Sequence, residues 1–210
     1  MESTHAPEAH GPGHALERLI FFSDAVFAIA ITLLIIEIHV PEVHQPASDL
    51  DYLSALARLA PNFASFFISF FVIGAFWAGH HRAFDCARHW SPKLIMPNLL
   101  MLSAIAAMPF FTAFSSEYYG QRVPVAFYTG WMVVIALLNI WVQRIATAAP
   151  VVGEEVGSQH RGMIRLRGIA VLLGAATAFL VTLIQPYAGQ MALASIYFWR
   201  LLLTRIAPPR

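Results

Sequence analysis

Six long apolar segments constrain this chain more than any other feature of its sequence. A helix that crosses a bilayer needs about 20 consecutive, mostly apolar residues. We expect membrane-spanning helices over 19–40, 59–81, 94–116, 124–145, 164–185 and 188–206. The composition agrees, because only 12% of the 210 residues are charged, against about 25% in an average soluble domain. The sequence therefore predicts an all-α integral membrane protein with six transmembrane helices.

The connections between these segments are short, which leaves room for one compact bundle and no separate soluble domain. We expect a disordered cytoplasmic tail over 1–17, a six-helix transmembrane domain over 18–206 and a short cytoplasmic tail over 207–210. The single cysteine, Cys86, excludes an intrachain disulfide and a zinc site built on paired cysteines.

The basic residues are unequally divided between the two sides of the six-span arrangement. One side carries Arg18, Arg82, Arg88, Lys93, Arg144, Arg161, Arg165, Arg167, Arg200, Arg205 and Arg210, and the other carries Arg58 and Arg122. Because cytoplasmic loops are rich in Lys and Arg, both termini are predicted to be cytoplasmic. The chain is thus expected to be a multi-pass protein of the cell membrane.

A polar cluster precedes the first apolar run. Arg18, Ser23 and Asp24 stand immediately before residues 25–36, and the run ends at Glu37. Such groups need a partner or a water-filled cavity in lipid, so the cluster indicates a site, a packing lock or an interfacial helix start. Arg18 and Asp24 lie on opposed faces of one helix and cannot pair with each other. Their partners are expected on other helices.

The end of the second span offers such partners at the same predicted depth. Trp77 carries an indole N–H, and either His80 or His81 can donate to or accept from Ser23 or Asp24. A polar lock between the first two spans would satisfy all of these groups. The alternative is an ordinary interfacial position, where His and Trp are common.

His81, Asp85 and His89 follow at intervals of four residues, a spacing that suits a metal or a proton relay. Arg82 and Arg88 stand beside them and disfavour a bound divalent cation. We therefore predict no metal site here and expect His81 and Asp85 to join the interhelical polar network.

Ile29, Thr32 and Ile36 share one stripe of the first span. On spacing alone this stripe is typical of ordinary packing. Other spans carry scattered polar residues, whose default role is interhelical hydrogen bonding. These are Asn62, Ser69, Asn98, Ser103, Asn139 and Gln143.

Two motifs resemble those of the transmembrane-protein-175 potassium-channel family. The first is Arg18-x-x-x-Phe22-Ser23-Asp24, and the second is Trp77-x-x-His80-His81-Arg82. The resemblance implies the prokaryotic form of that family, in which a single six-helix repeat assembles as a homotetramer. It also implies that the first span lines a central pore and that the residues of the first motif hold helices together around it.

The same resemblance implies that Ile29, Thr32 and Ile36 form the pore constriction. The expected activity is that of a moderately selective potassium channel with apolar rings in place of a TVGYG carbonyl filter. Glu37 would add negative charge at the pore mouth. Potassium would be the permeant ion, and no cofactor, enzymatic activity or nucleic-acid partner is expected.

Two other functions stay open. A proton-coupled divalent-metal transporter also has six spans and uses an HxxxD pair, which His81 and Asp85 imitate. That mechanism needs a second acidic or His pair in the fifth span, and residues 164–185 contain no Asp, Glu or His. A structural or accessory membrane protein is the second alternative.

Overall fold

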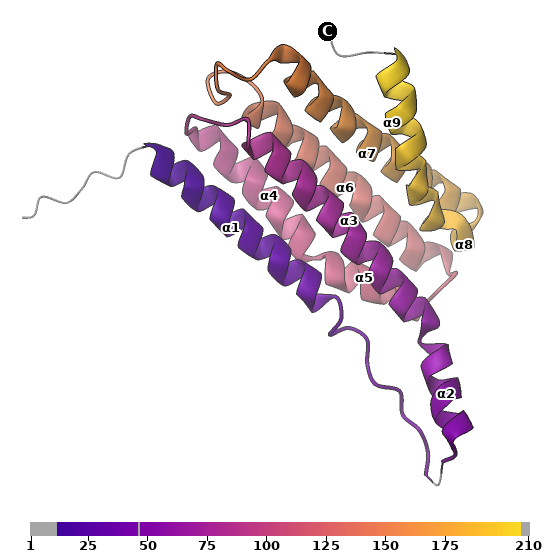
Figure 1. The fold of residues 1–210 in the computed structure, drawn as a ribbon. Helices are drawn as coiled ribbons and strands as arrows, with labels where there is room; N and C mark the ends of the chain where they lie inside the picture. Colours follow the sequence, from indigo (N-terminus) through magenta and orange to yellow (C-terminus); the bar gives the residue numbers. More distant parts are fainter. Residues whose placement is uncertain (1–11, 46, 207–210) are drawn as a thin grey trace, which may run out of the picture.

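The computed structural model describes residues 12–45 and 47–206, which are almost entirely helical (Figure 1). The longest helices are α1 (Pro12–Leu33), α3 (Ala60–Phe84), α6 (Arg122–Ala146) and α7 (Ser158–Ile184). The shorter ones are α2 (Asp49–Arg58), α4 (Ile95–Ala106), α5 (Met108–Glu117), α8 (Pro186–Gly189) and α9 (Ser195–Ile206). Two 3-10 turns, at Pro92–Leu94 and Met191–Ala194, precede α4 and α9.

Four helical segments of the described residues are long and apolar enough to cross a membrane. They are Ala60–Phe84, Pro92–Glu117, Arg122–Ala146 and Ser158–Ile184, which correspond to the second to fifth predicted spans. The first and last predicted spans fall short of this test. Helix α1 contains Glu17, Arg18 and Asp24, and the last helix, α9, has only 12 residues.

The ends of the first and last spans differ from the sequence prediction. Helix α1 begins at Pro12, inside the predicted tail, and ends at Leu33, seven residues before the predicted end at Val40. Tight turns follow, in which the Ile36 N–H donates to the Leu33 carbonyl at 3.1 Å. The turns contain the consecutive β-branched residues Ile35 and Ile36. Such residues have lower helix propensity, which agrees with the early end of α1. The last span is divided into α8, a 3-10 turn and α9 rather than one helix.

One further difference concerns the segment between the first two predicted spans. Residues 41–58, where no helix is predicted, contain a short helix, α2. The rest of the predicted N-terminal tail, 1–11, and the predicted C-terminal tail, 207–210, lie outside the described residues.

The third span is interrupted between α4 and α5. Helix α5 starts at Met108 with Pro109 in its first turn, a position where the missing N–H of proline costs no helical hydrogen bond. The Ala107 N–H still donates to the Ser103 carbonyl at 3.1 Å. The two helices therefore continue one another with a local change of direction.

Helix α7 packs closely against α9 through small residues. Ala170, Gly174 and Ala178 are buried, and a Cβ added at Gly174 would lie 2.9 Å from the Ile196 Cα. Such stripes allow helix backbones to approach in membranes. The bundle thus has α6 and α7 at its centre, with α1 and α9 on opposite sides (Figure 1).

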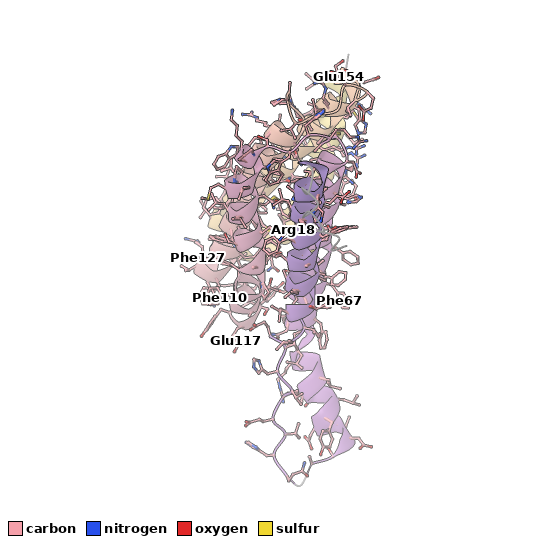
Figure 2. All side chains as sticks on the ribbon, turned by 90° about the vertical axis from the view of Figure 1, so that its left-hand side faces the viewer. Arg18, Phe67, Phe110, Glu117, Phe127 and Glu154 are labelled. Carbon is pink, nitrogen blue, oxygen red and sulfur yellow. The ribbon has the colours of Figure 1, made fainter. Side chains whose placement is uncertain are left out.

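Two loops meet at one end of the bundle. The Arg88 guanidinium pairs with the Glu155 carboxylate at 2.8 Å, and Ala87 and Val152 form an isolated β-bridge. Glu154 lies at this end and Glu117 at the opposite one (Figure 2). The loop that follows α3 and the loop that precedes α7 are thereby fixed to each other.

Candidate functional site

Helix α1 has one face packed into the bundle and one face uncovered. The packed face consists of residues that are at most 6% exposed, namely Leu16, Ser23, Phe27 and Ala30, and Leu34 is buried directly after the helix. On the other face, Ile29 is 57% exposed and Phe22 is 50% exposed. Figure 2 looks onto this side of the molecule, where α1 lies in front of the other helices.

A chain of buried hydrogen bonds fixes the packed face of α1. The Asn98 amide nitrogen, on α4, donates to the Ser23 hydroxyl at 2.9 Å. The Asn98 amide oxygen lies 2.8 Å from Nε2 of His80, on α3. All three side chains are buried. One buried amide therefore joins α1, α3 and α4.

The direction of this chain assigns the protons along it. The Ser23 hydroxyl donates to the Leu19 carbonyl at 2.7 Å, so its oxygen accepts from Asn98. With the Asn98 oxygen turned toward His80, Nε2 of His80 carries the proton. The His80 ring lies 4.4 Å from the Phe84 ring and 5.5 Å from the Phe27 ring, centroid to centroid. Two aromatic rings thus pack against the imidazole whose Nε2 contacts Asn98.

A second hydrogen bond joins α1 to α3 one turn away. The Trp77 indole N–H donates to the Asp24 carboxylate at 2.9 Å. The expected contact between the first two spans is therefore present, and its donor is the indole. The Trp77 ring also stacks on the His81 ring, with centroids 5.5 Å apart.

The other two residues of the first motif lie on the uncovered side. Arg18 is exposed, and within the described residues its side chain has no hydrogen bond or ion pair. The described residues of one chain thus provide no partner for Arg18 on another helix. Phe22 is half exposed and does not enter the packed face.

The His81 and Asp85 side chains approach each other at an exposed position. His81 Nε2 lies 3.7 Å from an Asp85 carboxylate oxygen. Helix α3 ends at Phe84, so the helical spacing that the sequence suggested does not extend to His89. In the part of the chain that the structure describes, no group of three or more His, Cys, Asp or Glu residues could hold a metal ion.

The predicted constriction residues lie along the uncovered face and beyond it. Ile29 and Thr32 lie within α1, whereas Ile36 lies in the turns that follow the helix and is 65% exposed. The Thr32 hydroxyl donates to the Ile29 carbonyl at 2.9 Å. Its oxygen lone pairs consequently remain available to a cation. Glu37 is exposed in the same turns.

Sequence reasoning did not single out Asn98. It was treated as one of several polar residues with a default hydrogen-bonding role, yet it connects both motifs. The sequence does contain part of this information. Asn98 is an amide side chain near the start of the third predicted span, at the predicted depth of Ser23 and His80.

The comparisons with known proteins agree with the two motifs. Residues 18–109 match the family model described as endosomal/lysosomal potassium channel TMEM175. A protein named potassium channel from Streptomyces collinus is 40% identical over 124 residues, which cover 57% of this chain and 59% of the relative. A potassium channel of Chamaesiphon minutus is 35% identical over 155 residues, which cover 71% of this chain and 73% of the relative.

A solved structure extends the likeness to nearly the whole fold. The crystal structure of a lysosomal potassium-selective channel TMEM175 homolog from Chamaesiphon minutus superimposes with a TM-score of 0.69 at 26% identity. The match covers 92% of this chain and 98% of the homolog. These relatives are named as channels and not as enzymes. The chain belongs to the TMEM175 family of potassium channels.

Proposed function

We propose that this chain is a moderately selective potassium channel that assembles as a homotetramer, with α1 of each copy lining a central pore. The observation that carries this proposal is the uncovered face of α1. In a chain of this family, that face leaves Ile29 57% exposed, and Ile36, in the turns that follow the helix, is 65% exposed. One helix cannot enclose a pore, so the faces of several copies would have to surround it.

The constriction would consist of two apolar rings and one polar ring. Four copies of Ile29 and of Ile36 form the apolar rings, which gate by size and dewetting. Four Thr32 hydroxyls lie between them. Each Thr32 hydroxyl donates its proton to the Ile29 carbonyl, with 2.9 Å between the two oxygens. The hydroxyl oxygen can therefore replace part of the water shell of a cation.

This chemistry favours potassium over sodium to a moderate degree. Removing water costs less for K⁺ than for the smaller and more strongly hydrated Na⁺. No fixed backbone carbonyls coordinate the ion as in a TVGYG filter, so selectivity is weaker. Glu37 and the acidic residues of the following segment, Glu42, Asp49 and Asp51, would attract cations to the pore mouth.

The first motif would act beside the pore and not within it. Ser23 and Asp24 bond to Asn98 and Trp77 inside one subunit, which orients α1. Arg18 is exposed and lacks a partner among the described residues, so we infer that a neighbouring subunit or lipid supplies one. The basic end of the bundle is assigned to the cytoplasm of the cell, together with both termini.

The divalent-metal transporter is not supported. The two bacterial relatives described above are named potassium channels. Helix α7 contains only His160 among the residue types that would provide the metal ligands, at the exposed start of the helix.

Reconstitution into liposomes tests the proposed activity. Vesicles that contain the purified oligomer are loaded with either K⁺ or Na⁺. The release of K⁺ should be faster than the release of Na⁺, and chloride should not permeate. Proton and Zn²⁺ fluxes are measured in the same preparation with pH-sensitive and metal-sensitive dyes. A well-folded oligomer that carries protons or Zn²⁺ without K⁺ would refute the proposal.

A further inference from the structure

A groove runs between α3, α7 and α9. Figure 1 shows α7 and α9 on the side of the bundle away from α1. It has a volume of about 510 Å³ and continues into an inner pocket of about 100 Å³. The two spaces share the side chains of Val72, Ala75 and Val171 as walls. None of the proposed pore residues lines either space.

Three arginines from three helices converge at one end of this groove. Arg82 comes from α3, Arg167 from α7 and Arg200 from α9. Arg82 is close enough to the other two for their charges to repel one another. Within the described residues, none of the three forms a salt bridge, and Nε of Arg167 is buried without a hydrogen-bond partner. A cluster of like charges at the basic end of the bundle, with Arg82 and Arg167 half-buried, favours a compensating anion.

The remainder of the groove is apolar. Its walls include Ile68, Phe71 and Met191. Ile68 precedes Arg82 by 14 positions on α3, which places them about 21 Å apart along the helix axis. This length exceeds half of the roughly 30 Å hydrocarbon core of a bilayer. The groove therefore has one cationic end and an apolar length suited to an acyl chain.

Two amides at the inner pocket add hydrogen-bond acceptors. Asn139 and Gln143 line that pocket beside Arg82 and Arg167. The side-chain oxygens of both amides are buried without a partner in the described residues. A buried acceptor without a donor is unfavourable. A ligand that carries hydroxyl groups next to its negative charge would satisfy both kinds of group.

We propose that this groove binds an anionic phospholipid of the surrounding bilayer. The phosphate contacts Arg82, Arg167 and Arg200, since guanidinium groups bind phosphate oxygens through charged hydrogen bonds. Head-group hydroxyls, such as those of phosphatidylglycerol, donate to Asn139 and Gln143. One acyl chain lies along α3 and α7. A soluble anion would leave the apolar length of the groove without a ligand.

The test is a titration of the full-length chain in a non-ionic detergent with short-chain phosphatidylglycerol. Bound lipid is counted by native mass spectrometry, and the thermal shift is measured in parallel. Phosphatidylglycerol should bind at least about tenfold more tightly than phosphatidylcholine of the same chain length. Arg200→Gln should weaken phosphatidylglycerol binding about fivefold, the equivalent of one basic residue near an anionic lipid. Arg205→Gln is the matched control, because Arg205 lies on α9 but does not line the groove.

Two further measurements test the proposal if Arg200→Gln does not fold. Ala194→Trp fills the groove and should weaken lipid binding, whereas Leu180→Trp, at an exposed position of α7 outside it, should not. Glycerol phosphate, which has the head-group chemistry and no acyl chain, should not compete at equal concentration. Equal binding of the two lipids, equal loss with Arg205→Gln, or full competition by glycerol phosphate would each overturn the lipid assignment.

Discussion

Asn98 joins both sequence motifs through two hydrogen bonds of one amide. It donates to Ser23 at 2.9 Å and faces His80 at 2.8 Å. Replacing Asn98 by Leu keeps the side chain similar in size. It leaves Nε2 of His80 without its partner and removes one of the two hydrogen bonds of the Ser23 hydroxyl, which still donates to the Leu19 carbonyl. We expect a loss of about 1–2 kcal/mol of stability, in the range of polar contacts between membrane helices. Thermal unfolding in detergent measures it.

Ser103 provides the matched control for this prediction. It lies on the same helix, is exposed and bonds only to the Leu100 carbonyl of its own helix. Ser103→Ala should change stability by less than about 0.5 kcal/mol. Equal effects of Asn98→Leu and Ser103→Ala would show that the buried chain does not hold α1 in place.

The Trp77–Asp24 contact predicts a separation between assembly and ion preference. Trp77→Phe keeps an aromatic ring and removes the donor to Asp24, so the oligomer should dissociate at a lower temperature. Asp24→Ala should act in the same way, and Asp24→Asn, which keeps an acceptor, should act less. The ratio of K⁺ to Na⁺ flux should stay unchanged in all three. Altered selectivity with intact oligomer stability would place Asp24 in the ion path instead.

For single residues, the sequence predicted which side chains make polar contacts better than it predicted which side chains they contact. Hydropathy placed Trp77 and Asp24 at the same membrane depth, so a polar contact between the first two spans could be expected there. The contribution of Asn98 could not, because hydropathy does not say which face of the third span turns toward α1. Arg18 has no partner among the described residues, because the sequence predicts a partner on another helix but not the subunit to which that helix belongs.

Helix α1 predicts the effect of changing the constriction. Replacing Ile29 or Ile36 by Ala widens an apolar ring, so conductance should rise and the discrimination of K⁺ from Na⁺ should weaken. Single-channel recording in planar bilayers measures both quantities. Leu180→Ala is the control, because Leu180 is an aliphatic residue with 60% exposure on α7, remote from α1. A constriction formed elsewhere would leave all three variants alike.

Helix α2 predicts a dependence on pH. The Asp51 carboxylate accepts from the Ser48 N–H at 2.8 Å and from its hydroxyl at 2.7 Å. These hydrogen bonds, with the backbone one first, lower the pKa of Asp51. The ionised Asp51 carboxylate therefore stabilises the helix start at pH values above the ordinary pKa of an aspartate. This contribution is lost as the pH falls through the lowered pKa of Asp51.

Hydrogen exchange of the α2 amides measures this effect. Protection of residues 49–53, corrected for intrinsic exchange, should fall at acidic pH in the native chain. Asp51→Ala removes the carboxylate that both Ser48 groups contact, so it should lower that protection at neutral pH and flatten its pH dependence. A pH profile in Asp51→Ala that matches the native chain would exclude the Asp51 cap as its source.

Element boundaries marked the limit of sequence reasoning. The four central spans agree with the prediction because apolar length alone determines them. The end of α1 at Leu33 and the division of the last span into α8 and α9 were missed, since apolar content does not distinguish a helix from consecutive turns. Helix α2 was missed because its residues are only partly apolar.

The whole molecule predicts an oligomer with α1 toward its centre. The uncovered face of α1 and the groove beside α9 lie on opposite sides of the bundle (Figure 1), so one can face other copies while the other faces lipid. Native mass spectrometry in mild detergent should give four copies. A stable monomer that conducts K⁺ would contradict this arrangement.

Thiol modification at Ile29 tests the proposed ion path most directly. Burial raises the pKa of the Cys86 thiol, which keeps it protonated and poorly reactive, so the native chain is a suitable background. A cationic, membrane-impermeant thiol reagent should block K⁺ flux through liposomes containing Ile29→Cys and should leave Leu180→Cys and the native chain unaffected. Complete modification of Ile29→Cys, verified by mass, with undiminished K⁺ flux would contradict a pore lined by α1.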